Sequence, residues 1–258
     1  MKNVFFSLLI VTLTVAAGCS GGSKKATQET KAETTEMNTL TEKEKAAGWV
    51  LLFNGKDLTG WRGYGKTTVP GAWSVAEGAM TLESSGRGEA GAENGGDLLY
   101  DKKFKNFHLK FDWKIAEGGN SGVFYLGQEV DGWEIWKTAP EFQILDNDRH
   151  IDAELGNDGN RKAASLYDLI PAKPQNTRPA GEWNTGEIMC SKGTVVYKQN
   201  GEKVLEFHLW TEDWNKLVAN SKFPELNPDW AKVAEEGFIV LQDHGDAVFY
   251  RNFKIREL

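Results

Sequence analysis

The sequence lacks the features on which several classes of protein depend. Its 258 residues carry a formal net charge of -7 and a pI of about 5.3, so it has no basic excess with which to bind nucleic acid. It has one long apolar run, at residues 4–17, and no second run that could cross a membrane. These absences argue against a nucleic-acid-binding protein and against a protein with several membrane spans.

Histidine and cysteine are also scarce. The chain has two cysteines, Cys19 and Cys190, and four histidines, at positions 108, 150, 208 and 244. No histidines have the paired spacing of a zinc site, so we predict no metal ligands and no cofactor. The Asp-Asn-Asp string at residues 146–148 offers oxygen ligands for a structural calcium, but such a cluster is more often a solvated turn.

A glycine-rich string at residues 86–91 (G-R-G-E-A-G) formally fits the G-x-G-x-x-G pattern of dinucleotide sites. Such a site needs the string between a strand and a helix, whose N-terminus then faces the pyrophosphate. Here Gly95 and Gly96 follow, and a predicted strand comes next. The string therefore indicates a mobile loop.

The N-terminus has the pattern of a bacterial export signal. Lys2 precedes the apolar run, which ends in Ala16, Ala17 and Gly18 directly before Cys19. A run this short, ending in small residues, is typical of a cleaved signal peptide. We therefore predict a signal at residues 1–18 and a lipidated Cys19, which anchors the protein without spanning the membrane. Cys190 is then the single remaining cysteine, and no intrachain disulfide can form.

The rest of the chain divides at about residue 46. Residues 19–45 are rich in Gly, Ser, Thr, Lys and Glu, and are predicted to form a flexible tether because they cannot bury enough apolar surface to fold. All ten tryptophans lie between Trp49 and Trp230. Residues 46–258 have the length of one all-β domain. We expect a cell-envelope lipoprotein, on the periplasmic or cell-surface side; the lack of acidic residues at positions 20–25 favours the periplasmic side.

Period-two alternation predicts strands through most of this domain. Apolar residues occupy every second position in residues 107–115, the pattern of a half-buried strand. Lys192-Gly193 and Asn200-Gly201 indicate two tight hairpins, the second between strands at 194–199 and 203–207. Residues 237–242 and 247–256 are expected to form another alternating pair. Helical signals are few: a helix at 228–236, capped by Asn227, and a short one after Thr211. The fold class predicted is an all-β sandwich with one or two short helices.

Two alternating segments place polar side chains on one face of a strand. In residues 141–145, Glu141 and Gln143 lie opposite Phe142 and Ile144. In residues 239–245, Gln242 and His244 lie opposite the apolar Ile239 and Leu241. Arg251 interrupts the apolar series Phe249, Phe253, Ile255. These polar residues either line a groove or cover solvated sheet faces, and the pattern alone leaves both readings open.

A carboxylate string, Glu129-x-Asp131-x-x-Glu134, is similar to the paired acids of retaining glucanases. Those acids need an unbroken strand to set their separation. Asp131-Gly132 is a turn signal, so we expect the three carboxylates to be scattered.

Several short motifs together resemble one bacterial family, the 3-keto-disaccharide hydrolase domain (DUF1080). They run in order from residue 47 to 258: L-L-F-N-G-K-D-L-T-G-W at 51–61, N-S-G-V-F at 120–124, E-F-Q-I-L-D at 141–146, S-L-Y at 165–167, E-W-N at 182–184, the Asn200-Gly201 hairpin, L-Q-D-H-G at 241–245 and Y-R-N at 250–252. Ser165 and Tyr250 depart from the glycine and phenylalanine that are usual there.

The resemblance implies a concanavalin A-like jelly roll with a concave sheet as its groove. It also implies an enzyme that acts on 3-keto-glucosides or disaccharides, already oxidised at C3 by a partner dehydrogenase. A C3 ketone acidifies the C2 proton, so a base can remove it; loss of the C1 substituent and addition of water complete a net hydrolysis.

We expect the catalytic groups to be Glu141, His244 and Tyr167, with Glu141 or His244 as base and acid and Tyr167 donating to the leaving group. The expected substrate-binding residues are Asn120, Gln143, Trp183, Gln242 and Arg251. The alternatives are a glycan-binding module without chemistry, a glycoside hydrolase that cleaves unoxidised substrate, and a surface scaffold.

Overall fold

The computed structural model describes residues 36–87 and 91–258, and within these ranges the chain forms two antiparallel sheets. The predicted signal peptide, Cys19 and the first part of the tether lie outside the described residues. No helix in the described ranges is long and apolar enough to cross a membrane.

The larger sheet has eight strands. In spatial order they are β11 (Glu202–His208), β10 (Thr194–Gln199), β9 (Asn184–Ser191), β6 (Phe107–Ile115), β13 (Val248–Glu257), β4 (Ala79–Leu82) and β3 (Trp73–Ala76), with β1 (Val50–Leu51) also paired to β13. Both predicted hairpins are confirmed, because residues 192–193 and 200–201 all have positive φ, the conformation that a two-residue hairpin turn requires.

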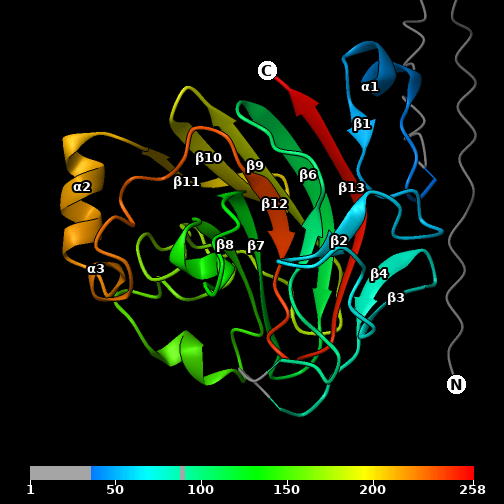
Figure 1. The fold of residues 1–258 in the computed structure, drawn as a ribbon, viewed down its shortest axis with the longest axis horizontal. Coiled ribbons are helices and arrows are strands. Elements are labelled where there is room, and N and C mark those ends of the chain that lie inside the picture. The colour runs from blue at the N-terminus through cyan, green and yellow to red at the C-terminus, as the bar shows by residue number, and fades with distance from the viewer. Residues whose placement is uncertain (1–35, 88–90) are drawn as a thin grey trace, which may run out of the picture. The chain divides into compact units, whose positions relative to one another are not determined.

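The smaller sheet has five strands, in the order β2 (Trp61–Gly63), β5 (Leu98–Tyr100), β12 (Phe238–Leu241), β7 (Asn120–Gly127) and β8 (Glu141–Leu145). The two sheets pack face to face around one aromatic-rich core, in which Phe111, Phe142, Tyr197 and Phe253 are fully or almost fully buried. The predicted all-β sandwich is therefore confirmed (Figure 1).

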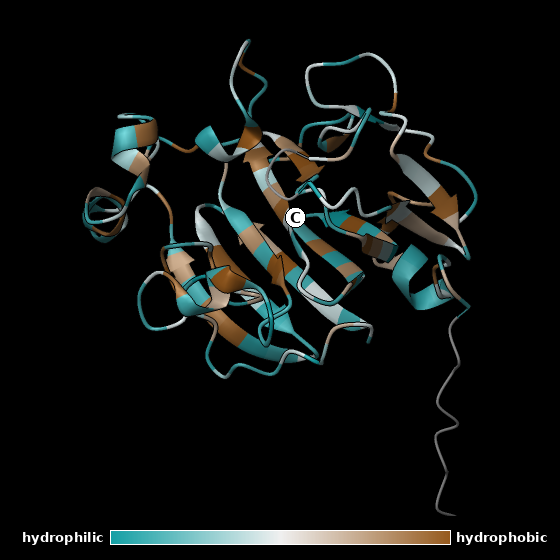
Figure 2. Ribbon diagram, turned by 90° about the horizontal axis from the view of Figure 1, so that it is seen from below, coloured by the Kyte–Doolittle hydropathy of each residue, from teal (hydrophilic) through white to brown (hydrophobic). Residues whose placement is uncertain are grey.

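Alternation decides which face of each strand enters the core. In β6 the burial alternates residue by residue over its whole length, as the sequence predicts. Figure 2 shows this as alternating teal and brown bands along the strands. In β7 and β8, by contrast, every residue is buried. The outer face of the smaller sheet is therefore covered too, by a second apolar cluster that includes Phe124, Ile135 and Val240.

The helices are short and peripheral. Helices α2 (Glu212–Ala219) and α3 (Phe223–Leu226) lie together at one side of the molecule, and α1 (Glu42–Ala46) lies on the other side near β1 and β13 (Figure 1). Two 3-10 helices, η2 (Ile135–Lys137) and η3 (Ile151–Glu154), flank β8 in the chain. The predicted cap is confirmed for α2, where the Thr211 hydroxyl accepts the Trp214 N–H at 3.1 Å.

The helix predicted at residues 228–236 is wrong, since that segment forms turns. Asn227 ends α3 instead of starting a new helix: its side-chain amide donates to the Lys137 carbonyl, and its Oδ1 accepts the Asp229 N–H in a local turn. Trp230 is buried and donates its indole N–H to the Trp136 carbonyl. These contacts hold residues 227–230 against η2.

The predicted pairing of the last two strands is also wrong. Strand β12 belongs to the smaller sheet and β13 to the larger, so residues 242–247 cross from one sheet to the other. This crossing places His244 and Asp246 at one end of the sandwich. The string at residues 86–91 contains no strand or helix at positions 86, 87 and 91, and residues 88–90 lie outside the described residues.

The ordered domain begins earlier than residue 46. Backbone N–H groups of Asn38 and Asn252 each donate to the other's side-chain oxygen, at 2.6 and 2.8 Å. Thr41 and Glu44 form a capping box on α1, and Glu44 pairs with Lys254. The predicted tether boundary is therefore corrected, because Asn38 and Glu44 are bonded to residues of β13.

Candidate functional site

A cleft with a volume of about 760 Å³ opens on the outer face of the smaller sheet. Its floor is formed by the starts of β7 and β8 and by the segment that follows β12. Its walls come from residues 91–97, η2 and α3. Six of the residues predicted from the sequence line it: Asn120, Glu141, Gln143, Tyr167, Gln242 and His244. Segments far apart in the sequence thus converge on one face of this sheet.

Glu141 is a buried carboxylic acid on the floor of the cleft. It is 7% exposed, and no described residue donates a hydrogen bond to its carboxyl group. Burial raises its pKa from 4.5 to about 8, with Asp152 and Asp97 adding to the effect and Lys222 opposing it. Glu141 therefore retains its proton at neutral pH and can act as a general acid.

Gly122 makes room for this carboxyl group. A Cβ atom at position 122 would lie 2.1 Å from Glu141 Oε1. The glycine of the N-S-G motif is therefore a steric requirement of the site. The neighbouring Ser121 donates to the Gln242 carbonyl at 2.8 Å and is bonded to the Tyr250 hydroxyl at 2.9 Å, which ties the two sheets together beneath the cleft.

Three side-chain amides in the cleft have unused hydrogen-bonding capacity. Both polar atoms of the Gln143 amide, Asn120 Oδ1 and Gln242 Oε1 are buried and have no partner among the described residues. Buried polar atoms without partners cost free energy, so such groups normally meet a ligand or solvent. Their position on the floor of the cleft makes them suitable for binding hydroxyl or carbonyl oxygens.

His244 lies between a carboxylate and an amide. Its Nδ1 is 3.7 Å from Asp246 Oδ2, and its Nε2 is 3.3 Å from Asn120 Nδ2. With the amide as donor, Nε2 is the acceptor and the ring proton sits on Nδ1, facing Asp246. Asp246 is itself held by the Asn120 backbone N–H at 3.0 Å. This order of groups orients a histidine to act as a base.

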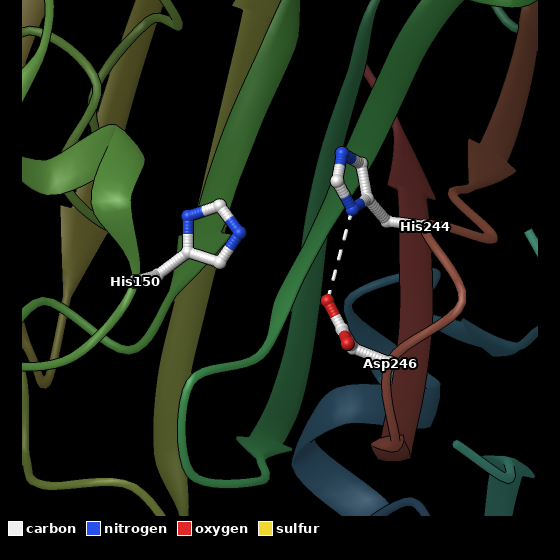
Figure 3. A group of neighbouring side chains, drawn as sticks. All are labelled: His150, His244 and Asp246. Atoms are coloured by element: carbon white, nitrogen blue, oxygen red, sulfur yellow. Dashed lines mark ion pairs between the residues drawn. The ribbon is translucent and has the colours of Figure 1, made fainter. Parts of the chain in front are cut away.

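His150 approaches the same pair, and Figure 3 shows its ring facing the gap between His244 and Asp246. One ligand atom from each of the three residues lies within 4.8 Å of the others, which is a candidate metal site. However, His150 Nδ1 accepts the Asp152 N–H at 3.1 Å. A neutral imidazole that accepts at Nδ1 carries its proton on Nε2 and has no lone pair there for a metal. The observed hydrogen bond therefore fits a proton donor better than a metal ligand.

Tyr167 is engaged by other residues. Its hydroxyl donates to Asp152 Oδ2 at 3.0 Å and accepts from Lys222 Nζ at 3.2 Å. Burial raises the pKa of Tyr167 well above its ordinary value, and burial lowers that of Lys222. Tyr167 thus holds Lys222 at the wall of the cleft. The Lys222 amine there can offer positive charge to a substrate oxygen.

A pair of half-buried aspartates fixes the opposite wall. Asp243 accepts the backbone N–H groups of Ala92, Gly96 and Gly245 at 2.7–2.9 Å, and Asp97 accepts the Asp243 N–H at 2.9 Å. Burial, followed by the nearby Asp243 charge, raises the pKa of Asp97 to about 7. Asp97 is therefore a second acid in the cleft that is able to exchange a proton near neutral pH.

Trp183 and Arg251 do not lie in the cleft, which corrects their predicted assignment. The Arg251 guanidinium stacks on Trp183 at 3.9 Å and bonds Asp112 at 3.1 Å, on the larger sheet. The reason is that β13 belongs to the larger sheet, and Arg251 alternates along it with the buried Tyr250. Tyr250 and Phe253 therefore face the core, while Arg251 lies on the outer face of the other sheet.

The remaining acidic strings have structural roles. Glu129 forms a bidentate pair with Arg62 at 2.7 Å, and residues 128–132 form no strand. The predicted scattering of the glucanase-like acids is confirmed. In the 146–148 string, Asp146 accepts the Gly118 and Asp148 N–H groups; calcium there stays a prediction.

Four residues of the site were missed in the sequence: Asp97, His150, Lys222 and Asp246. None lies in an alternating segment with a second polar residue, so periodicity could not select them. Asp246 had a weak signal, two positions after His244 in a predicted turn.

Comparison with known proteins places this geometry in a family. The model of the 3-keto-alpha-glucoside-1,2-lyase-like domain matches residues 48–256. A curated 3-keto-disaccharide hydrolase from Bacteroides thetaiotaomicron is 46% identical over 289 aligned positions, covering 100% of both chains.

Two solved structures agree with the fold. A crystal structure of a candidate glycosyl hydrolase from Parabacteroides distasonis is 34% identical, with a TM-score of 0.76, and the match covers 86% of this chain and all of the other. A Bacillus subtilis protein of unknown function with a galectin-like fold is 14% identical, with a TM-score of 0.50 over 86% of this chain and 94% of the other. The second likeness concerns the fold alone, a jelly-roll sandwich.

Proposed function

Because the chain belongs to the 3-keto-alpha-glucoside-1,2-lyase-like family, we propose that it is a carbohydrate-active enzyme that cleaves 3-keto-glucosides and 3-keto-disaccharides. Its net reaction is a hydrolysis, carried out as 1,2-elimination followed by hydration. The observation that carries this proposal is the pairing, in one cleft, of a histidine backed by a carboxylate with a glutamic acid whose pKa is raised to about 8. A base and an acid with these properties are what the elimination needs.

In the first step His244 Nε2 takes the proton from C2 of the substrate. The electrons of the C2–H bond form an enolate with the C3 ketone, and then a C1–C2 double bond as the C1–O bond breaks. Glu141 gives its proton to the departing oxygen. The Lys222 amine and the Gln143 and Asn120 amides are placed to stabilise negative charge on the C3 oxygen.

In the second step water adds to C1 of the resulting 3-keto-2-hydroxy-glucal. The Glu141 carboxylate takes a proton from the water, and protonated His244 returns a proton to C2. Both side chains then regain their starting protonation states, and the products are the 3-keto sugar and the released alcohol. The substrate must come from a separate dehydrogenase that oxidises C3, because this cleft needs the ketone to acidify C2.

The proposal is tested by incubating the purified protein with a 3-keto-glucoside and with its unoxidised parent. Release of the aglycone from the keto form alone supports the elimination, and both Glu141→Gln and His244→Ala are then expected to lose activity by about 10²-fold or more while remaining folded. Release from the parent alone indicates a direct glycoside hydrolase.

A glycan-binding module is the second candidate, and the unpartnered amides on the cleft floor favour it equally. Saturable sugar binding without release from either substrate would establish that function instead. The two functions differ in one respect: a binding module does not need Glu141 to change its protonation state, so Glu141→Gln would leave sugar binding intact.

A further inference from the structure

A second hollow adjoins the cleft and shares two of its wall residues, Tyr64 and Trp133. It has a volume of about 760 Å³ and is lined by Arg62, Tyr64, Thr67, Glu129, Val130 and Trp133, among others. The hollow is as large as the cleft itself and falls within the range of small-molecule sites. The catalytic groups Glu141 and His244 line only the first of the two spaces.

The floor of the second hollow is cross-linked by hydrogen bonds and is slightly acidic. Arg62 donates two hydrogen bonds of 2.7 Å to Glu129 and one of 2.8 Å to Asp101. Glu129 also accepts the Gly65 N–H at 2.7 Å, and Lys66 donates to the Gly95 carbonyl at 2.7 Å. The lining holds two cations, Arg62 and Lys66, against three carboxylates, Asp101, Glu129 and Asp131, so its charge disfavours an anionic ligand.

The walls above this floor are partly apolar. Trp133 is 37% and Val130 38% exposed. The loop that carries them is pinned by Tyr64, whose hydroxyl donates to the Gln128 carbonyl at 3.0 Å and accepts the Val130 N–H at 3.2 Å. An exposed indole beside a polar floor that disfavours anions suits an uncharged ligand that has both hydroxyl groups and an apolar face. A pyranose ring has this character.

We infer that the second hollow is the subsite for the sugar that leaves from a 3-keto-disaccharide, with Trp133 as its shared wall. This inference rests on the proposed function, which places the 3-keto ring beside Glu141 and His244. The sugar attached at C1 then extends past Trp133 into the second hollow. A methyl or other small aglycone does not reach it.

The test uses two neighbouring threonines. Thr67 and Thr68 are both exposed, but only Thr67 lines the hollow. Thr67→Trp fills the hollow and Thr68→Trp is its matched control. Kinetics are measured for wild type and both variants on a methyl 3-keto-glucoside and on a 3-keto-disaccharide that releases glucose.

For Thr67→Trp, we expect kcat/KM on the disaccharide to fall by at least about tenfold, roughly 1.4 kcal/mol. Its activity on the methyl substrate, and both activities of Thr68→Trp, should stay within about twofold of wild type. Equal losses on both substrates, or no loss on the disaccharide, would overturn the subsite.

If wild-type protein acts on neither substrate, the proposed function fails and the subsite is judged by binding. Calorimetry with the unoxidised disaccharide then compares the two variants. Weaker binding by Thr67→Trp than by Thr68→Trp supports a sugar subsite in the second hollow, and equal binding overturns it.

Discussion

Asp246 shows how a residue outside the cleft can decide the chemistry within it. It faces His244 Nδ1 and is fixed by the Asn120 N–H. At 3.7 Å its carboxylate is too far for a hydrogen bond, but its charge favours the tautomer with the ring proton on Nδ1 and the lone pair on Nε2. The role of Asp246 is positioning, since it does not line the cleft.

Replacing Asp246 with Asn should keep the fold and lower kcat by about 10²–10⁴-fold, because an amide can donate to Nδ1 and stabilise the wrong tautomer. Kinetics with substrate deuterated at C2 provide the decisive measurement. The isotope effect should increase, since proton removal becomes more rate-limiting. Asp213→Asn, on exposed α2, is the control; an unchanged isotope effect in Asp246→Asn would contradict the assignment of His244 as base.

The raised pKa of Glu141 makes stability depend on pH. Between pH 4.5 and about 8 the native carboxyl group holds a proton that the unfolded chain has released. Rising pH therefore favours unfolding, by up to about 1.4 kcal/mol per pH unit for this one group. Asp97, with its pKa raised to about 7, acts in the same direction.

The Glu141→Gln variant should lose part of this dependence. Urea titrations at pH 5 and pH 9 are expected to show a smaller fall in the free energy of unfolding than in wild type, because the variant has no charge to bury at high pH. Part of the pH dependence of the free energy of unfolding should remain in the variant, because Asp97 still contributes to it. Exposed Glu154→Gln should behave as wild type. A slope identical to that of wild type in Glu141→Gln would mean that the carboxyl group is not protonated in the native protein.

At the scale of elements, the site depends on how closely β7 and β8 approach. Gly122 lies opposite Gln143 in the register of these strands, and its missing side chain leaves space for Glu141. Both strands are buried on both faces. A side chain added at position 122 meets the Glu141 side chain, which has to shift to make room for it.

Gly122→Ala should therefore displace the Glu141 carboxyl group. We expect activity to fall by at least about tenfold and the free energy of unfolding by about 1–3 kcal/mol, as in other overpacked sites. Gly71→Ala is the control, because a Cβ there meets its nearest neighbour at 3.7 Å, an ordinary contact. Enzyme assays and urea titration measure the two effects; full activity in Gly122→Ala would show that the carboxyl group tolerates displacement.

At the scale of the whole molecule, the predicted lipid anchor determines where the enzyme meets its substrate. We propose that Cys19 is lipidated and that the protein is held at the cell envelope, on the periplasmic or cell-surface side. The proposal is supported by the Ala-Ala-Gly-Cys sequence at residues 16–19 that ends the apolar run.

In a detergent phase partition, wild type should enter the detergent phase. A Cys19→Ala variant should lose its lipid and enter the aqueous phase. The free and buried Cys190 provides the control, as Cys190→Ala should partition like wild type. Equal partitioning of Cys19→Ala and wild type would contradict lipidation. Protease treatment of intact cells distinguishes the periplasmic side from the surface.

The sequence by itself determined the features that depend on neighbouring residues. Alternation identified β6, the hairpins followed from Lys192-Gly193 and Asn200-Gly201, and Glu141 and Gln143 were assigned to one face of β8. These predictions succeed because side chains alternate along a strand and because few residues tolerate positive φ.

Only the tertiary structure decided which distant segments meet. It separated β12 from β13, so that the segment between them crosses the sandwich and brings His244 and Asp246 to His150. It removed Arg251 from the site because β13 lies in the larger sheet, where Arg251 stacks on Trp183. The raised pKa of Glu141 is likewise a tertiary property, because it comes from burial by residues that are remote in the sequence. Period-two patterns record the face of a strand, but they contain no information about its sheet or its neighbours.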